Sequence, residues 1–205
     1  MARVTSMRLL PSRAPAAVLD PAVRALAALG VTPNMLSVAG LLGNGVAGFL
    51  VARGDLVAGG IVMLLASALD MLDGALARRT GKATRFGALL DSTFDRLSEA
   101  AVLFGVLLHT LDRGHDEQAA LAFVAIVGSL MVSYVRARGE GLGVSMTDGL
   151  FTRPERVVVL GVALLFGWLR AALWVLAVLT MLTASQRLFL GARALARDSG
   201  EDGDR

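Results

Sequence analysis

The chain has 205 residues, of which 55% are apolar and 18% are charged, and its mean hydropathy is +0.65. A soluble domain of this length rarely has this balance, and the apolar residues fall into blocks of roughly 20 residues, the length of a bilayer-crossing helix. The composition therefore excludes a soluble globular protein and predicts an all-α, polytopic membrane protein. Cysteine is absent, which excludes disulfides and thiolate chemistry.

The first 31 residues form a basic leader. Arginines at positions 3, 8, 13 and 24 interrupt any apolar core, so a cleaved signal peptide is not expected. Residues 18–29 are mildly amphipathic and predict an interfacial helix that lies on the membrane surface. A plain cytosolic leader is the alternative.

Six transmembrane helices follow the leader. Their expected ranges are 34–52, 57–78, 86–111, 118–138, 155–169 and 171–191. Only the short segment GWLRAA separates the last two, so that boundary is the least defined. We expect one membrane domain over residues 1–197, in which 1–31 are the leader, and a polar, disordered cytoplasmic tail over 198–205.

The distribution of arginine predicts the orientation. Six spans put both termini on one side, and that side also carries the basic loops 79–85 and 139–153. The opposite loops hold only Arg53, Arg113 and Arg170. The positive-inside rule therefore predicts a multi-pass protein of the cell membrane whose termini and basic loops face the cytoplasm. A sequence pI near 10.5 then suggests contact with anionic lipid, and we expect no nucleic acid partner.

Four aspartates lie where charge is most expensive, inside the second and third spans. Asp70 and Asp73 share one helix face at a spacing of three, and Asp91 and Asp95 share another at a spacing of four. The two helices are consecutive and antiparallel, so the carboxylates can converge near the cytoplasmic loop. Four ionised carboxylates need positive charge between them in a low dielectric. Oxygen-only ligands favour a hard cation such as Mg²⁺, Mn²⁺ or Ca²⁺.

Neighbouring residues suit a phosphorylated substrate. Gly74 directly follows Asp73, and Gly87 lies one turn before Asp91, so both allow close approach of a ligand or a backbone. Arg78 and Thr84 could meet phosphate oxygens. A metal-centred site with an arginine and a glycine-lined approach suits a diphosphate substrate.

The segment Asp70-x2-Asp73-Gly74-x2-Ala77-Arg78-x8-Gly87-x3-Asp91-x3-Asp95 resembles the complete signature of the CDP-alcohol phosphatidyltransferases. The resemblance implies a six-span helical fold, usually dimeric, with its active site open to the cytoplasmic leaflet. It also implies two divalent ions, Mg²⁺ or Mn²⁺, and transfer from a CDP-linked lipid such as CDP-diacylglycerol to an alcohol, with release of CMP.

The resemblance assigns roles to single residues. It makes Asp70, Asp73, Asp91 and Asp95 the metal ligands, and Asp95 also the base that deprotonates the attacking hydroxyl. It places Gly74, Arg78, Thr84, Thr32, Pro33, Asn34 and Met35 against the CDP group. Thr32 and Pro33 also have a structural interpretation, as the N-cap and first residue of the first span, and the two roles are compatible.

A second basic cluster bears on the acceptor alcohol. Arg153 and Arg156 share a helix face, and Thr152 with Glu155 predicts a capping box that begins the fifth span. Arginines that converge on a helix N-terminus form an anion site, although the positive-inside rule alone could place them there. These segments resemble the phosphatidylinositol phosphate synthases, in which residues at Arg136, Arg153, Arg156 and Arg187 would line a pocket for inositol 1-phosphate. Glycerol 3-phosphate is the alternative acceptor.

Other interpretations stay open. Intramembrane carboxylates also occur in cation transporters and proton relays, but the chain shows neither internal repeats nor broken helices. Glu99, one turn after Asp95, could support the aspartate site or form an ion pair. Trp168 and Trp174 are predicted to lie in the outer aromatic belt.

Overall fold

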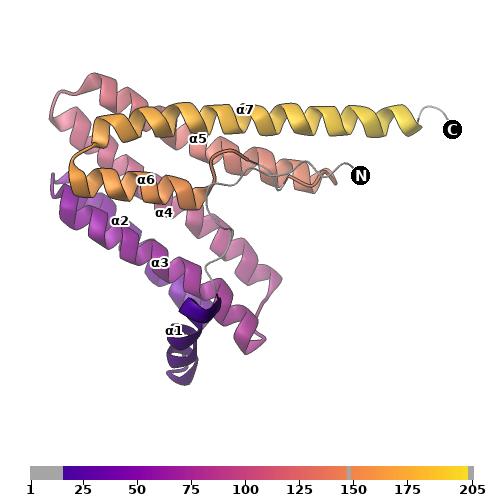
Figure 1. Ribbon diagram of the computed structural model, residues 1–205, viewed down its shortest axis with the longest axis horizontal. Helices are drawn as coiled ribbons and strands as arrows, with labels where there is room; N and C mark the ends of the chain where they lie inside the picture. Colours follow the sequence, from indigo (N-terminus) through magenta and orange to yellow (C-terminus); the bar gives the residue numbers. More distant parts are fainter. Residues whose placement is uncertain (1–15, 147–148, 203–205) are drawn as a thin grey trace.

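The computed structural model describes residues 16–146 and 149–202, and every regular element in this part of the chain is a helix (Figure 1). The helices are α1 (Ala16–Ala28), α2 (Pro33–Ala52), α3 (Leu56–Thr80), α4 (Arg85–Asp112), α5 (Asp116–Gly141), α6 (Arg153–Phe166) and α7 (Leu169–Asp202). The predicted all-α class is confirmed. Each of the six apolar blocks forms one helix, α2 to α7.

Four helices are long and apolar enough to cross a bilayer: α2, α3, α5 and the part of α7 over Leu169–Ala196. The other two predicted spans, α4 and α6, do not meet these criteria of length and apolar composition, each for its own reason. Helix α4 carries the acidic pair and further charged residues in its first half, and α6 has only 14 residues. At 1.5 Å per residue α6 is about 21 Å long, whereas the hydrocarbon core is about 30 Å thick. The six-span count therefore stays a prediction.

The ends of α2 to α5 lie within three residues of the predicted boundaries. The boundary between the last two helices differs, because Gly167 adopts the left-handed conformation (φ 75°) and its N–H bonds to the Ala163 carbonyl. That cap ends α6 at Phe166 instead of residue 169. Helix α7 continues to Asp202, into the segment predicted to be disordered, and residues 203–205 lie outside the described residues.

The six helices α2 to α7 pack as a closed ring. Helix α2 contacts both α3 and α4, α4 contacts α5, α5 contacts α7, α7 contacts α6, and α6 returns to α3. All six contribute to one apolar core, which includes Val51, Val106, Leu164 and Leu173. Because α3 and α4 barely touch each other, α2 is the common support of the two helices that carry the aspartates.

The contact between α2 and α4 is a backbone contact. A Cβ atom built at Gly105 would lie 2.1 Å from the carbonyl oxygen of Gly48, and one at Gly48 would lie 2.4 Å from the carbonyl oxygen of Ala101. Only glycine fits at such a crossing. The close approach holds α4 in a fixed register against α2.

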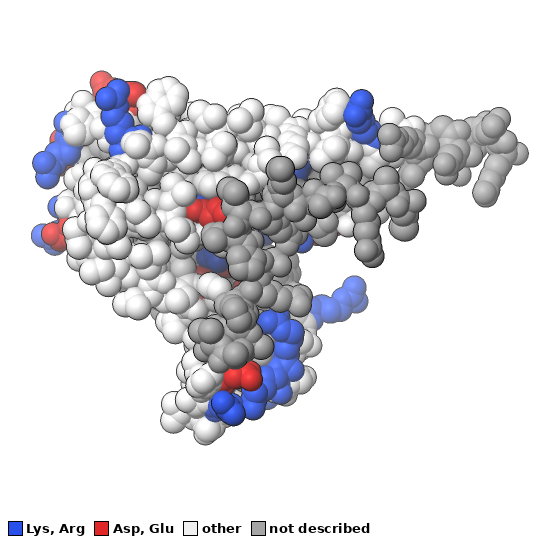
Figure 2. Space-filling model, in the orientation of Figure 1, with Lys and Arg blue, Asp and Glu red and all other residues white. Residues whose placement is uncertain are grey.

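Helix α1 lies against α3 at one end of the bundle (Figure 1). Val23, Leu36 and Leu76 form a small apolar cluster there, and an ion pair joins Arg79 to Asp20 at 3.6 Å. Lys and Arg side chains gather over this end (Figure 2).

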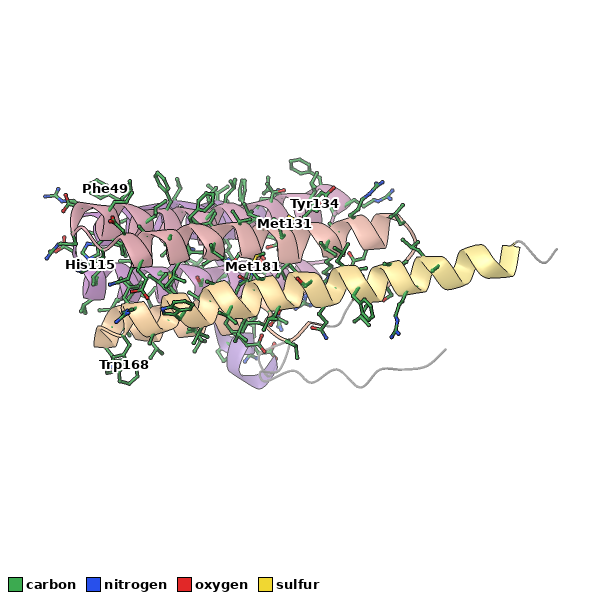
Figure 3. All side chains as sticks on the ribbon, turned by 90° about the horizontal axis from the view of Figure 1, so that it is seen from above. Phe49, His115, Met131, Tyr134, Trp168 and Met181 are labelled. Atoms are coloured by element: carbon green, nitrogen blue, oxygen red, sulfur yellow. The ribbon has the colours of Figure 1, made fainter. Side chains whose placement is uncertain are left out.

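Phe49, His115 and Trp168 mark the opposite end of the bundle, away from the far end of α7 (Figure 3). The indole of Trp174 donates a hydrogen bond to Glu117 there at 2.8 Å. The molecule thus has one end with aromatic and mixed charged residues and one basic end.

Candidate active site

The four predicted aspartates converge near the basic end of the bundle. Asp70 and Asp73 are buried on the inner side of α3, and Asp91 and Asp95 are partly buried on α4. Asp73 and Asp91 line one pocket, and Asp70 and Asp95 contact one and the same arginine, Arg153. Spacings of three and four residues put each pair on one helix face, and the packing of α3 and α4 on α2 turns the two faces toward each other.

Arg153, the first residue of α6, lies inside this acidic cluster. Its Nη2 donates to Asp70 Oδ2 at 2.9 Å, and its Nη1 lies 2.8 Å from Asp95 Oδ1. One guanidinium therefore joins the aspartates of α3 to those of α4. Its Nε is buried and makes no hydrogen bond in the described part of the chain.

The donor set fits a hard divalent cation. Four carboxylates and a guanidinium occupy one partly buried region, so positive charge between the aspartates is compatible with the fold. In the described residues, no group of three or more His, Cys, Asp or Glu side chains is arranged to hold a metal ion. Arg153 contacts one oxygen each of Asp70 and Asp95. Asp70, Asp73, Asp91 and Asp95 are the residues that would hold the metal.

An open pocket lies beside the aspartates. It is lined by Pro33, Asn34, Ser37, Asp73, Gly74, Ala77, Arg78, Lys82, Ala83, Thr84, Gly87, Ala88 and Asp91. Five of the residues predicted to contact a CDP group are in this lining. Thr32 and Met35 are not: the Thr32 hydroxyl accepts a hydrogen bond from the Met35 N–H at 3.3 Å, and the Met35 side chain is 57% exposed. The cap interpretation of Thr32 and Pro33 is thus confirmed.

The pocket is suited to an anion. Helices α2 and α4 both begin at its wall, and the Thr84 hydroxyl caps α4 by accepting from the Gly87 N–H at 2.9 Å. Helix N-termini carry partial positive charge, and Arg78 and Lys82 add two full charges to the same lining. The arrangement can hold a diphosphate next to the carboxylates.

Arg156 has different partners from those predicted. Its Nε and Nη2 donate to the two carboxylate oxygens of Glu99 at 2.6 and 2.7 Å, and its Nη1 donates to the Phe151 carbonyl at 3.2 Å. Ser129 on α5 donates to the same carboxylate at 2.9 Å. Arg156 is only 3% exposed. In this geometry it is a buried ion-pair partner that links α6 to α4, and its contact with an acceptor phosphate stays a prediction.

The contacts described for the remaining acceptor-side arginines lie away from the aspartates. Arg187 is buried and donates through Nη1 to the Val132 carbonyl at 2.8 Å. A Cβ atom at Gly149 would lie 2.7 Å from Arg187 Nη2, so this loop residue packs directly on the guanidinium. Arg136 pairs with Glu140 at 2.9 Å, and both side chains are about half exposed. Arg153 is thus the predicted acceptor ligand that the structure brings to the aspartates.

Comparison with known proteins identifies the family. Residues 30–189 match the CDP-alcohol phosphatidyltransferase family. The chain belongs to this family. The matched region contains the whole aspartate signature, the pocket and Arg153. The family predicted from the signature is therefore confirmed.

Individual relatives in the CDP-alcohol phosphatidyltransferase family carry more specific names. The chain is 40% identical over 196 residues to a phosphatidylinositol phosphate synthase of Corynebacterium glutamicum, covering 90% of this chain and 89% of that protein. It is 38% identical over 173 residues to an archaetidylinositol phosphate synthase of Pyrococcus horikoshii, covering 84% and 89%.

The fold resembles crystal structures of the phosphatidylinositol phosphate synthase of Mycobacterium tuberculosis. The structure with bound CDP-DAG has a TM-score of 0.79 and 32% identity, over 85% of this chain and 94% of that one. The structure in complex with manganese and citrate has a TM-score of 0.76 and 34% identity, over 84% and 88%.

Two residues of the site were not predicted from the sequence. Ser37 lies on α2, outside the signature, and its hydroxyl donates to Asp73 Oδ2 at 2.6 Å. Lys82 lies in the loop before α4, where helical periodicity gives no signal. A basic residue just before a helix N-terminus that faces a predicted phosphate is the cue that could have identified Lys82.

Proposed function

We propose that this chain transfers the phosphatidyl group of CDP-diacylglycerol to inositol 1-phosphate and releases CMP. The observation that carries the proposal is a four-carboxylate cluster, bridged by Arg153, that shares Asp73 and Asp91 with an anion-suited pocket. The relatives named phosphatidylinositol phosphate synthase, and the related structure with CDP-DAG, support the choice of substrates. Membership of a phosphatidyltransferase family disfavours a cation transporter.

The proposed mechanism divides the work among three groups of residues. Arg78 and Lys82, with the N-termini of α2 and α4, hold the CDP diphosphate in the pocket. Asp95 accepts the proton of the acceptor hydroxyl, whose oxygen then forms a new P–O bond while the bond to CMP breaks. Asp70, Asp73, Asp91 and Asp95 would hold Mg²⁺ or Mn²⁺, which would supply polarisation of the phosphoryl group and charge stabilisation of the leaving CMP.

Arg153 is the proposed link between acceptor and chemistry. Its guanidinium already lies beside Asp95, so a phosphate bound by it would bring the acceptor hydroxyl near the base. Arg136 and Arg187 stay candidates for the outer part of the acceptor site. Arg156 supports the start of α6 through Glu99 and the Phe151 carbonyl, and it stays a candidate for the acceptor site.

The wider setting is also proposed. The basic end of the bundle, with the aspartates and α1, faces the cytoplasm of the cell membrane, and α1 lies in the interface. Helices α2 to α7 all cross the bilayer, with the short α6 and the charged α4 shielded by their neighbours in the ring. The chain acts as a homodimer, as the resemblance to its family implies.

One assay tests the proposal against its nearest alternatives. Purified protein in detergent receives CDP-diacylglycerol, Mg²⁺ or Mn²⁺, and one acceptor in each parallel reaction: inositol 1-phosphate, glycerol 3-phosphate, inositol or serine. We expect CMP release with inositol 1-phosphate alone. Release with glycerol 3-phosphate alone would instead identify a phosphatidylglycerophosphate synthase. Because one named relative is an archaetidylinositol phosphate synthase, the ether-linked CDP-lipid is included as a second donor.

A further inference from the structure

Helix α2 supports the first aspartate pair, although it contributes no residue to the family signature. Ser37 is 4% exposed, and its hydroxyl lies 2.6 Å from Asp73 Oδ2 and 3.3 Å from the Pro33 carbonyl. A hydroxyl has one proton to donate. The shorter contact has the length of a charge-assisted O–H···O⁻ bond, so the proton is directed to Asp73.

Gly40 makes room for the other member of the pair. A Cβ atom built at Gly40 would lie 1.6 Å from Asp70 Oδ1, so no larger residue fits unless this carboxylate moves. Helices α2 and α3 are antiparallel, joined by a short turn over residues 53–55. A spacing of three on α2 therefore matches a spacing of three on α3 in reverse order. Ser37 meets Asp73, and Gly40 meets Asp70.

We propose that α2 positions the first aspartate pair for a divalent cation, with Ser37 as the positioning residue of Asp73. This inference rests on the proposed function, because it takes Asp73 to be a metal ligand. The Ser37 hydroxyl holds Oδ2 and leaves Oδ1 for the cation, on a side chain that borders both Asp91 and the pocket. Partners of this kind, which hold a ligand without touching the metal, orient it and raise metal affinity.

The test measures metal binding directly. Purified full-length protein in detergent is titrated with Mn²⁺, and bound ion is followed by electron paramagnetic resonance and by the rise in unfolding temperature. Loss of such a supporting bond weakens metal binding by about 10–100-fold, so Ser37→Ala should raise the Mn²⁺ midpoint by that factor. Because Asp73 is retained, turnover should largely recover at high Mn²⁺. The matched control is Ser98→Ala, which removes another buried hydroxyl, one with no hydrogen-bond partner in the described residues.

A second pair of variants tests the same helix independently. Gly40→Ala should shift Asp70 and raise the Mn²⁺ midpoint as well. Gly45→Ala makes the identical change on α2 at a position where the added methyl meets nothing within 4 Å, and its midpoint should equal that of the wild type. Unfolding temperatures without Mn²⁺ show whether each variant is folded.

The outcomes separate the inference from the proposed function. If the wild type binds Mn²⁺ and folded Ser37→Ala has the same midpoint, the positioning role of Ser37 is wrong while the metal site stands. The same conclusion follows if Ser98→Ala weakens binding as much as Ser37→Ala does. If the wild type binds no Mn²⁺, the proposed metal-dependent function is overturned, and the inference fails with it.

Discussion

At the scale of single residues, the aspartates are expected to act unequally. Asp95→Asn should remove the proposed base and leave Asp70, Asp73 and Asp91 to hold metal. Loss of a general base typically costs about 10²–10⁴ in rate, so turnover should fall by that factor while CDP-diacylglycerol still binds. Single-turnover CMP release and a binding assay for the CDP-lipid measure the two effects separately. If Asp95→Asn abolishes lipid binding, Asp95 is a metal ligand with no demonstrated role in proton transfer.

Arg153 should affect the acceptor more than the donor. A hydrogen bond to a charged group contributes about 1.5–3 kcal/mol, so Arg153→Ala should raise the KM for inositol 1-phosphate by at least about tenfold. The KM for CDP-diacylglycerol should change little. Arg138→Ala, an exposed arginine on α5, is the matched control for loss of one positive charge. An unchanged acceptor KM in Arg153→Ala would leave Arg153 as a partner of Asp70 and Asp95 alone.

At the scale of helices, the buried pair of Glu99 and Arg156 joins three elements. Glu99 on α4 accepts from Arg156 on α6 and from Ser129 on α5. Glu99→Gln would leave the buried guanidinium without its counter-charge, which typically costs about 3–5 kcal/mol. We expect a clear fall in the unfolding midpoint in mixed micelles.

The control for Glu99→Gln is Glu140→Gln, which breaks the half-exposed pair with Arg136. Exposed pairs contribute about 0–1 kcal/mol, so this variant should unfold almost as the wild type does. Equal midpoints for the two variants would show that the network of Glu99 does not hold α4, α5 and α6 together.

The helices were predictable from the sequence because their signals are local. The apolar blocks predicted six helices, and the Thr32 cap predicted the start of α2. The aspartate spacings predicted the inward faces of α3 and α4. Even the error at the end of α6 had a local signal, since Gly167 is a typical C-cap residue.

The contacts between helices were not predictable from one sequence. The hydrogen bond from Ser37 to Asp73 spans 36 residues, and the contact of Arg153 with Asp70 spans 83. Both depend on the register of helices that only the packed bundle defines. The same limit explains Arg156: its place on the helix face of Arg153 was correct, but its burial against Glu99 depends on where α4 lies.

At the scale of the whole molecule, the positions of the helix ends determine where the chemistry takes place. The pocket beside the aspartates is lined by Arg78 and Lys82 of the basic end, and Trp168 and His115 lie at the other end (Figure 3). A phosphorylated acceptor and CMP are water-soluble, so the site must open to the compartment that contains them. The basic end is therefore expected to face the cytoplasm.

Cysteine labelling tests this orientation and also tests whether α4 and α6 cross the membrane. The natural chain has no cysteine, so single substitutions report one site each. Lys82→Cys and His115→Cys bracket α4, and Leu150→Cys and Trp168→Cys bracket α6. In intact cells, a membrane-impermeant maleimide should label positions 115 and 168 and leave 82 and 150 unmodified until the membrane is opened.

Each wrong outcome has a distinct meaning. External labelling at 82 and 150 would show that the protein has the opposite orientation. The aspartates would then lie on the outer face, away from cytoplasmic substrates. Labelling of 150 and 168 from the same side would show that α6, at about 21 Å from 1.5 Å per residue, does not cross the bilayer. Arg153 would then begin a re-entrant helix, and the water-filled access that such a helix needs would become the route of the acceptor to Asp95.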